Sequence, residues 1–348
     1  MRVLHVVEAM GGGTLSAVLT LADATPELDH HLVVWPRREH ADAGGERAVL
    51  GGIHLLPAGS VAAVRALRAT VRTLAPQVVH AHSSYAGMLV RAAGLDVRVA
   101  YSPHCFGFER RDLGGAGRTG VRLVERALVR RTDVLVACSP HEARLATGLG
   151  HRDVVLVPNR ALHPPAEQAA PAAPGGPLRA VTVGRIGAQK DWRFLLEVKA
   201  AHERSYDAPV AWTWLGDGDD DGARALREAG IAVSGWLPRE EVVHRLAAAQ
   251  AYVHTAAWEA APVSILEAAA AGLPVVARAI PTLESLHVPG LGATPADLAA
   301  GLAALHDPAA WAAAQTLARR FSARHTPGDQ RAGLEVAYGR ATAALITS

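Results

Sequence analysis

The strongest chemical signal in the chain is a pair of glutamates, Glu259 and Glu267, within the stretch WEAAPVSILEAAAAGLPVV at 258–276. Proline is favoured at the first position of a helix. We therefore expect Pro262 to open a helix, with Glu259 in the loop before it and Glu267 in its second turn. The two residues before this proline are both alanine, so no side chain there can cap the helix start.

An uncapped helix start leaves amide groups free to bind an anion. These amides belong to Val263, Ser264 and Ile265, and the helix dipole adds to their attraction for negative charge. A loop carboxylate, bare amides and a helix carboxylate together suit a phosphate flanked by hydroxyl groups, which is the layout of a nucleotide sugar. An ordinary amphipathic helix with two solvated glutamates is the alternative interpretation.

A second group of charges is Gly184-Arg185-x4-Lys190, which directly follows a strand pattern and leads into a helix pattern around Phe194. On a parallel sheet this loop lies at the carboxyl edge, where two cations are well placed to grip a diphosphate. They would also neutralise the charge that develops on it as it leaves. The alternative is a loop with two solvated charges.

A glycine run, Gly11–Gly13, and Thr14 follow the first strand pattern. Glycine lets the backbone approach a ligand closely, and Thr14 favours a helix start. A dinucleotide fingerprint is not supported, because the second strand pattern ends in WPRR at 35–38 and lacks the expected acidic residue. The chain has no P-loop motif, which argues against ATP hydrolysis of that type.

Three histidines stand at the ends of neighbouring strand patterns: His80, His82 and His104. His80 and His82 share a strand face, so a metal site is conceivable. No nearby cysteine or acidic residue has suitable spacing, and we therefore expect no metal. The favoured interpretation is that one or more of them line a cleft as hydrogen-bonding groups, with a core histidine as the alternative for His80.

Two further segments end strand patterns in the second half. The acidic run Asp217 and 219–221 favours a turn with solvated carboxylates over a calcium loop, because no glutamate closes such a loop. The segment SGWLP at 234–238 ends the next strand at the same edge, where it can present backbone groups to a base.

Arginines recur at helical spacing on two amphipathic patterns. A face of this kind can bind an anionic membrane, although a solvated face is the usual case. The two sets are Arg65, Arg68 and Arg72, and Arg118, Arg122, Arg126 and Arg130.

The composition sets the class of protein. A chain of 348 residues, half of them apolar, suggests about two domains, and a net charge of +2 argues against a nucleic-acid partner. Cys105 and Cys138 form no CxxC pair, which suits a reducing compartment. The start has no signal-peptide pattern and no long apolar run occurs, so we expect a cytoplasmic protein.

Short Val- and Leu-rich runs alternate with helical patterns, which predicts parallel sheets covered on both faces. The predicted helices include 60–74, 121–131 and 328–346. The predicted strands are Val3–Val7, His31–Trp35, Val78–His82, Val97–Ser102, Val134–Ala137, Val154–Val157, Ala180–Val183, Ala211–Leu215, Ala232–Trp236, Ala251–His254 and Pro274–Ala277.

The proline-rich segment 161–178 interrupts this alternation and predicts a linker. We expect an N-terminal Rossmann-like domain at 1–160 and a C-terminal Rossmann-like domain at 179–325. A final helix at 326–348 could pack on either domain. Both halves begin with a strand, a glycine-containing loop and a helix, as two doubly wound units do, with ligands expected at the strand ends between them.

Taken together, these segments resemble the retaining glycosyltransferases of family 4 (group 1), and the resemblance covers nearly the whole chain. It implies the GT-B fold, in which two Rossmann-like domains face a central cleft. By this resemblance, 1–160 would be the acceptor-side domain and 179–325 the nucleotide-sugar-binding domain. Its markers are GGG (11–13), PQVVHAHS (76–83), SPH (102–104), VPN (157–159), GRIGAQK (184–190), LGDGD (215–219), SGWLP (234–238) and the E-x7-E pair.

The resemblance also implies roles for individual residues. Arg185 and Lys190 would bind the donor diphosphate, Glu267 the ribose hydroxyls and Glu259 the hydroxyls of the transferred sugar, while His104 would approach its C6 side. The remaining donor-binding residues implied are Gly12, Gly13, Trp236, Leu237, Pro262, Val263 and Ser264. Members of the family usually need no metal, so neither a metal nor a cofactor is expected.

The chain departs from the family pattern at several positions, which leaves the sugar undefined. Alanines occupy the positions after Glu259 where glycine and an aromatic residue are common. Asp191, Arg160 and Cys105 each stand where glycine is common.

The expected activity is transfer of a hexose from a nucleotide-diphosphate donor to an acceptor hydroxyl with retention of configuration. UDP is favoured over GDP, and the acceptor is a small molecule, a glycan or a lipid-linked compound. The leaving diphosphate would take the acceptor proton. Two alternatives are a nucleotide-sugar epimerase and a non-catalytic nucleotide-sugar-binding module. Peripheral membrane contact is an open possibility, and the sequence leaves the oligomeric state undefined.

Overall fold

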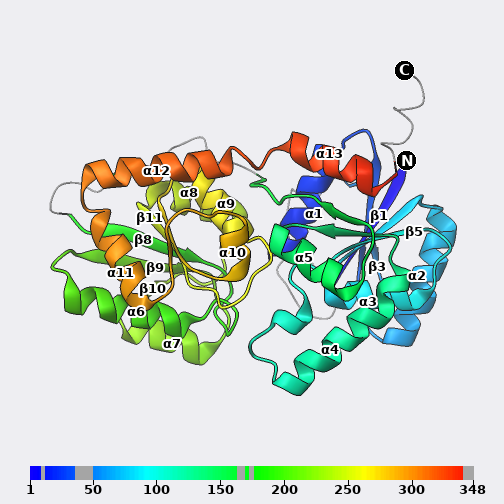
Figure 1. Ribbon diagram of the computed structural model, residues 1–348, viewed down its shortest axis with the longest axis horizontal. Coiled ribbons are helices and arrows are strands. Elements are labelled where there is room, and N and C mark those ends of the chain that lie inside the picture. The colour runs from blue at the N-terminus through cyan, green and yellow to red at the C-terminus, as the bar shows by residue number, and fades with distance from the viewer. Residues whose placement is uncertain (9–11, 36–49, 163–168, 172–175, 340–348) are drawn as a thin grey trace. The chain divides into compact units, whose positions relative to one another are not determined.

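The computed structural model describes residues 1–8, 12–35, 50–162, 169–171 and 176–339 (Figure 1). The chain forms two compact units. The first comprises Met1–Arg160 together with Thr326–Ser348, and the second comprises Ala161–His325. The last described helix of the chain therefore belongs with the N-terminal residues.

The first unit is built on a seven-stranded sheet with the order β3-β2-β1-β4-β5-β6-β7. Every neighbouring pair of strands is parallel, which requires a crossover between them. The strands are β1 (Arg2–Val7), β2 (Asp29–Val34), β3 (Gly52–Leu55), β4 (Val78–His82), β5 (Arg98–Ser102), β6 (Val134–Ala137) and β7 (Val154–Leu156).

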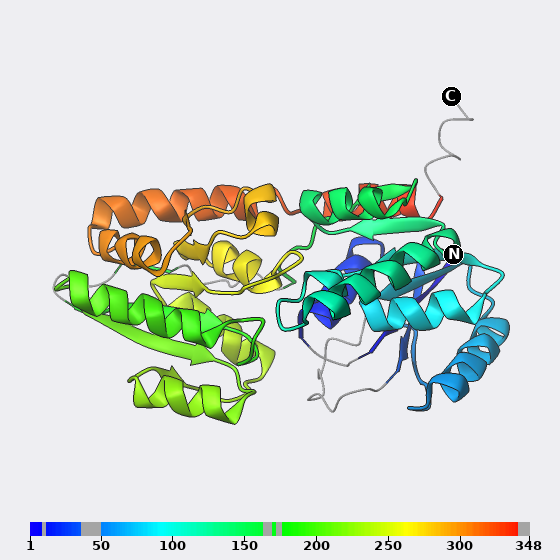
Figure 2. The ribbon, with the colours of Figure 1, turned by 60° about the horizontal axis from the view of Figure 1, so that its bottom comes forward.

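Helices cover both faces of this sheet, as Figure 1 shows. Helix α13, drawn in red, lies beside α1, drawn in blue, and the two helices pack on each other (Figures 1 and 2). The helices are α1 (Gly12–Ala24), α2 (Ser60–Leu74), α3 (Ser84–Ala93), α4 (Gly115–Leu128), α5 (Pro140–Leu149) and α13 (Pro327–Ala337), with short 3-10 turns η2 (Gly107–Glu109) and η3 (Val129–Arg131).

Alternation along the strands divides the first unit into two cores. Leu4 and Val6 of β1 pack in the cluster that includes α2 and α3. Val3 of β1 packs instead with Leu21 of α1 and Leu334 of α13. Successive strand residues point to opposite faces, so His5 lies on the face that α1 and α13 cover.

The second unit has a six-stranded parallel sheet with the order β10-β9-β8-β11-β12-β13. Its strands are β8 (Leu178–Val183), β9 (Val210–Leu215), β10 (Ala232–Val233), β11 (Ala251–His254), β12 (Val275–Arg278) and β13 (Leu291–Gly292). Its helices are α6 (Trp192–Ser205), α7 (Asp220–Glu228), α8 (Arg239–Ala248), α9 (Val263–Ala270), α10 (Pro281–Ser285), α11 (Pro295–Ala304) and α12 (Pro308–Ser322).

The predicted alternation of strands and helices is confirmed, but strands β3 and β13 were not predicted and several boundaries were wrong. Helix α4 begins at Gly115 and ends at Leu128, whereas the predicted helix covered 121–131. Helix α1 begins at Gly12 and not at Thr14. Strand β10 ends at Val233, because Gly235 takes a positive φ of 73° and pairs in an antiparallel bridge with Gly216. Helix α13 ends at Ala337, and the predicted continuation over 340–346 lies outside the described residues.

A close contact inside the first unit gives a test of this packing. A Cβ atom on Gly87 of α3 would lie 2.4 Å from a ring carbon of Tyr101, which is fully buried under the Arg91 guanidinium. We expect Gly87→Ala to lower the free energy of unfolding by roughly 1–3 kcal/mol, because the crowded core must shift. Chemical denaturation measures the change.

The matched control is Gly148→Ala in α5, where an added Cβ meets no atom within 4 Å. This variant should be neutral or up to ~1 kcal/mol more stable, because alanine favours a helix over glycine. Equal stability of the two variants would contradict the packing described at Tyr101.

Candidate active site

The loop after β8 fixes the position of Lys190. Gly184 has a φ of 141°, and a Cβ there would lie 2.6 Å from Cε of Lys190, so only glycine lets the lysine stem cross the loop. The Lys190 Nζ atom lies 2.7 Å from Oε1 of Glu259, and both side chains are largely buried. The structure thus brings together two of the residues that the sequence predicted to act together.

The loop after β9 is bound closely to the loop after β8. Trp214 donates a hydrogen bond from Nε1 to the Gly184 carbonyl over 2.8 Å. A Cβ on Gly216 would lie 2.2 Å from that carbonyl, and one on Gly218 would lie 2.2 Å from the carbonyl of Ile186. The two glycines of LGDGD therefore let the loop after β9 approach the backbone of the loop after β8. The prediction of a turn with solvated carboxylates did not include this role.

Arg185 differs from Lys190 in its surroundings. It is exposed, and it makes no hydrogen bond or ion pair with any residue that the structure describes. Its guanidinium is therefore available to an anion at the carboxyl edge of the second sheet.

The start of α9 agrees with the sequence in part. No side chain caps the helix, as predicted. Pro262, however, is the N-cap residue and not the first helical residue, so the helix begins at Val263. The prediction of a free Ile265 amide was wrong, because this amide donates to the Pro262 carbonyl over 3.1 Å. The amides of Val263 and Ser264 remain to bind an anion.

Glu267 lies in the second turn of α9 and is 3% exposed. Its carboxylate forms an ion pair with Arg239 at the start of α8. Arg239 was not predicted, because it reaches Glu267 from the start of another helix, 28 residues earlier in the chain.

His254 at the end of β11 is a further residue that the sequence analysis missed. Its Nδ1 atom lies 3.2 Å from the Tyr252 hydroxyl, and its Nε2 atom lies 3.7 Å from Oε1 of Glu259. This Nε2 atom is buried without a hydrogen-bond partner among the described residues. Burial, and secondarily the charge of Lys190, lower the pKa of His254 well below its usual value, so the ring is neutral.

Two departures from the family pattern, Asp191 and Arg160, have structural explanations. Asp191 takes a positive φ of 49°, caps α6 by accepting from the Phe194 amide, and pairs with Arg278 over 2.7 Å. Arg160 donates to Gln330 of α13 over 2.9 Å and pairs with Asp23 of α1. Nothing in the structure explains the alanines at 260 and 261.

Two residues predicted to contact a base differ in exposure. Trp236 is 60% exposed, whereas Leu237 is partly buried and packs against the core of the second unit. In the first unit, Gly12 and Gly13 are exposed at the start of α1, and Gly11 lies outside the described residues.

His104 sits in a strained turn after β5. His104 and Cys105 both have positive φ values, 48° and 81°, which side chains other than glycine rarely adopt. Glu142 holds this turn: one carboxylate oxygen accepts from the Cys105 amide over 2.8 Å and the other from the Cys138 amide over 2.9 Å. Glu142 was not predicted, because its role arises from the packing of α5.

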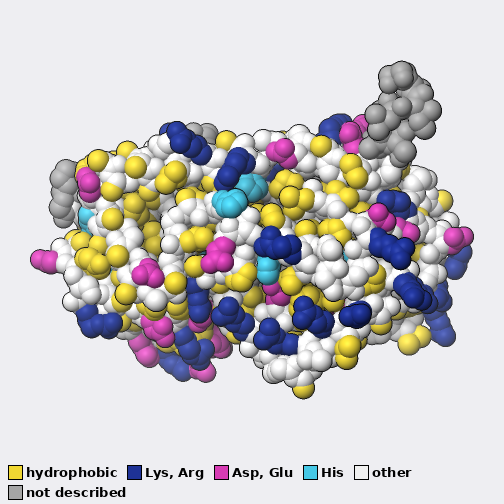
Figure 3. All heavy atoms as spheres, in the orientation of Figure 1, with side chains coloured by type: hydrophobic (Ala, Val, Ile, Leu, Met, Phe, Trp, Pro, Cys, Tyr) yellow, Lys and Arg dark blue, Asp and Glu magenta, His cyan; other side chains and the backbone are white. Residues whose placement is uncertain are grey.

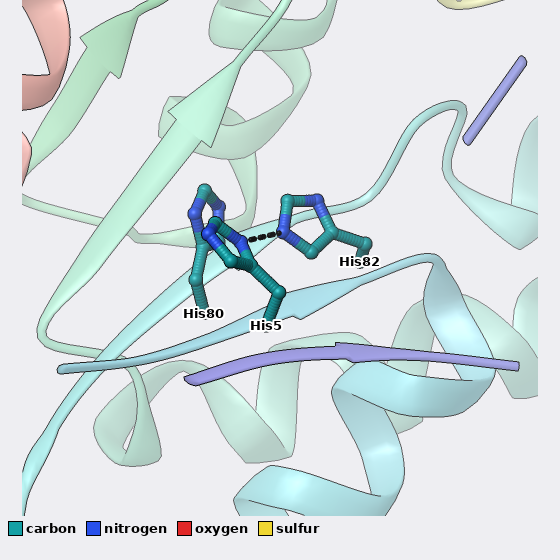
Figure 4. A group of neighbouring side chains, drawn as sticks. All are labelled: His5, His80 and His82. Carbon is teal, nitrogen blue, oxygen red and sulfur yellow. Dashed lines mark hydrogen bonds between the residues drawn. The ribbon is translucent and has the colours of Figure 1, made fainter. Parts of the chain in front are cut away.

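His80 and His82 do share a strand face, and β1 adds His5 beside them (Figure 4). One nitrogen of each ring lies within 4.8 Å of the others, a spacing within reach of a metal ion. Every ring nitrogen of the three, however, has a hydrogen-bond partner. Hydrogen bonding therefore accounts fully for this cluster, and the core interpretation holds for His80, which is fully buried.

The basic face of α4 is partly engaged. Arg118 donates to the Phe108 carbonyl over 2.8 Å, and the Arg122 guanidinium lies over the Phe108 ring. Basic side chains gather over α4 in Figure 3, and Leu123 on the same helix is 62% exposed. Among the described residues, no helix has the length and apolarity needed to cross a bilayer.

Comparison with known families supports an assignment. Residues 2–160 match the family described as "Glycosyl transferase 4-like domain", and residues 177–315 match "Glycosyl transferases group 1". The chain belongs to these glycosyltransferases. A Klebsiella pneumoniae protein described as "Uncharacterized 41.2 kDa protein in cps region" is 24% identical over 311 residues, 84% of each chain.

Solved structures confirm the GT-B fold. The sucrose-phosphate synthase of Thermosynechococcus elongatus superposes with a TM-score of 0.79 at 17% identity, covering 99% of each chain. Anabaena Alr3699/HepE in complex with UDP-glucose gives 0.74 at 16% identity, covering 100% of each chain. The lipopolysaccharide outer core galactosyltransferase WaaB gives 0.68 at 17% identity, covering 96% of this glycosyltransferase and 99% of WaaB.

Buried neutral histidines predict a loss of stability in mild acid. Burial lowers the pKa of His80 to about 3 and that of His104 to about 4; burial, then the charge of Arg91, lowers that of His151 to about 4. An unfolded histidine titrates near 6.5. The unfolded chain therefore binds more protons below that pH, and each such histidine should cost about 1.4 kcal/mol of stability at about pH 5.5.

Chemical denaturation at a series of pH values measures this loss. His151→Gln is the informative variant, because His151 is buried in the first unit and belongs to no histidine cluster. It should make the decline of stability with falling pH shallower by about one proton. A free energy of unfolding that stays constant from about pH 7 to about pH 5.5 would contradict the neutral state of these rings.

Proposed function

We propose that this glycosyltransferase transfers a hexose from a UDP-hexose donor to an acceptor hydroxyl with retention of configuration, releasing UDP. The observation that carries the proposal is the arrangement at the carboxyl edge of the second sheet. There the exposed Arg185, the paired Lys190 and the uncapped start of α9 provide positive charge and bare amides. A diphosphate matches these groups in charge and hydrogen-bonding capacity.

Lys190 and Glu259 would exchange partners when the donor binds. In the ligand-free protein they neutralise each other. A donor phosphate would attract Lys190 and leave the Glu259 carboxylate to accept from hydroxyl groups of the transferred sugar. Charge that develops on the leaving diphosphate would then be stabilised by Arg185, Lys190 and the two free amides, Val263 and Ser264.

The nucleoside would occupy the neighbouring loops of the second unit. Glu267 would accept from the ribose hydroxyls, with Arg239 holding its carboxylate in place. Trp236, 60% exposed, would offer an aromatic surface to the base, and Leu237 an apolar one.

Roles in the first unit rest on the family resemblance. His104 would contact the transferred sugar, and Gly12 and Gly13 would let the backbone approach the diphosphate and the acceptor. The acceptor itself is proposed only by class: a small molecule, a glycan or a lipid-linked compound. The exposed residues of α4 suit contact with an anionic membrane surface, where a lipid-linked acceptor would be found.

A UDP donor is favoured because related folds bind it. Anabaena Alr3699/HepE was solved with UDP-glucose, and an Escherichia coli protein described as "Trehalose-6-phosphate" was solved with UDP-2-fluoro glucose. We further propose that no metal is needed, because cationic side chains and amides supply the charge that a metal would otherwise provide. We also propose a cytoplasmic location.

Replacement of the two cations tests the diphosphate site. Arg185→Ala and Lys190→Ala should each lower kcat/KM by roughly 30-fold or more, about 2 kcal/mol of transition-state stabilisation. The matched control is Arg193→Ala, which removes an exposed arginine that stacks on Trp192 of α6. Near-wild-type kcat/KM for Arg185→Ala and Lys190→Ala would contradict the assignment.

A donor screen tests the activity itself. Thermal-shift binding with UDP- and GDP-sugars should favour UDP, and NMR of the glycoside product should show the anomeric configuration of the donor. Turnover should persist in the presence of EDTA. Inverted product would contradict retention, and a new sugar isomer formed from the donor alone would favour the epimerase.

A further inference from the structure

Four histidines of the first unit, His30, His5, His82 and His104, form one continuous hydrogen-bonded chain, called the histidine chain below. His30 Nδ1 lies 3.0 Å from His5 Nε2. His5 Nδ1 lies 3.0 Å from His82 Nε2, the contact drawn in Figure 4. His82 Nδ1 in turn lies 3.0 Å from His104 Nε2. The chain joins β2, β1 and β4 to the strained turn after β5.

The contacts of His30, at one end of the histidine chain, determine which nitrogen of each ring donates a hydrogen bond. His30 Nε2 lies 3.0 Å from the Thr25 carbonyl and 3.0 Å from the Thr25 hydroxyl. The carbonyl can only accept, and the hydroxyl already donates its proton to the Leu21 carbonyl. His30 must therefore carry its proton on Nε2.

A neutral imidazole has one donor nitrogen and one acceptor nitrogen. The protonated nitrogen of one ring therefore determines which nitrogen of the next ring is protonated. Burial lowers the pKa of all four rings, and His104 reaches about 4. With His30 Nδ1 as an acceptor, His5 must donate from Nε2. His82 must then donate from Nε2 to His5, and His104 must donate from Nε2 to His82.

We propose that this histidine chain is a tautomer lock that keeps Nδ1 of His104 unprotonated, as a hydrogen-bond acceptor for a hydroxyl group of the ligand. His30, His5 and His82 are positioning residues, and His104 is the member that meets the ligand. No residue that the structure describes hydrogen-bonds to His104 Nδ1, so this acceptor is left for a ligand.

The charges around the chain favour the neutral state at its ligand end. Glu27 and Asp29 lie near His30 and raise its pKa, which burial and His31 lower. Burial and, secondarily, other histidines lower the pKa of His5 and His82, and burial lowers the pKa of His104. His80, beside the chain, has its own partners: its Nε2 donates to the Ser102 hydroxyl and its Nδ1 accepts from Tyr338.

The lock sets a class of sugar, and this part of the inference rests on the proposed function. An uncharged ring with a bare Nδ1 accepts from a hydroxyl, but it repels a carboxylate, which is itself only an acceptor. A neutral hexose is therefore the expected donor sugar, and a uronic acid is not. Binding and turnover should favour UDP-glucose or UDP-galactose over UDP-glucuronate by about tenfold or more.

The decisive test is spectroscopic and does not depend on activity. Long-range 1H–15N correlation NMR of the full chain, labelled with 15N-histidine at about pH 7.5, reports which ring nitrogen carries the proton. We expect all four rings to be protonated on Nε2 alone. Single replacements His5→Gln, His30→Gln, His82→Gln and His104→Gln assign the signals. A proton on Nδ1 of any of these four rings in the wild-type protein would overturn the lock.

A break in the chain gives a second test. His30→Phe removes the acceptor that orients His5, so His104 should show a mixture of tautomers. The matched control is His54→Gln, which changes a histidine on β3 that is outside the chain and should leave the His104 signals unchanged. An unchanged His104 spectrum in folded His30→Phe would overturn the proposal. If that variant does not fold, the wild-type spectrum still decides.

Metal binding would be a competing outcome. A zinc ion on His5, His80 and His82 would take ring nitrogens that already have hydrogen-bond partners, and it would break the contact between His5 and His82. Elemental analysis of the protein after incubation with Zn²⁺ should therefore show no stoichiometric zinc. One equivalent of zinc in the wild-type protein that is absent from His80→Gln would overturn the lock. Failure of every nucleotide sugar to bind would reject the proposed function while the NMR result stands. Preference for UDP-glucuronate would overturn the inferred sugar class.

Discussion

The ion pair between Lys190 and Glu259 is the interaction on which the second unit's chemistry depends. A largely buried cation and carboxylate are stable only because each neutralises the other. Gly184 lets the lysine stem cross the loop. The Thr255 hydroxyl holds the Lys190 backbone by donating a hydrogen bond to its carbonyl over 2.6 Å. An anionic ligand can replace the Glu259 carboxylate as the partner of Lys190, so the ion pair keeps a positively charged lysine in place for a diphosphate.

The secondary structure around this ion pair could largely be predicted from the sequence, because it depends on residues that are close together in the chain. The parallel α/β class follows from Val-rich runs between helical patterns, and the uncapped start of α9 follows from Ala-Ala-Pro before Val263. The E-x7-E spacing correctly put one glutamate in a loop and the other in the second turn of a helix. The amide of Ile265 could not be judged, because its bond to Pro262 depends on where the helix begins.

What the sequence could not supply are contacts between distant segments. Arg239 reaches Glu267 from another helix, and Glu142 supports the His104 turn from α5. The histidine chain has the same origin. The spacing of His80 and His82 was visible, but the addition of His5 requires the parallel register of β1 and β4, in which His5 pairs with His80. Histidines thus occupy part of a strand face that would otherwise be apolar, and hydrogen bonds connect them.

The central claim is that the carboxyl edge of the second sheet binds the diphosphate of a nucleotide sugar. A crystal structure of the protein with UDP tests it most directly. The account predicts phosphate oxygens within hydrogen-bond distance of Arg185, Lys190 and the amides of Val263 and Ser264, with the Lys190–Glu259 contact lengthened. UDP bound elsewhere, with that ion pair intact and Arg185 still facing solvent, would contradict the account.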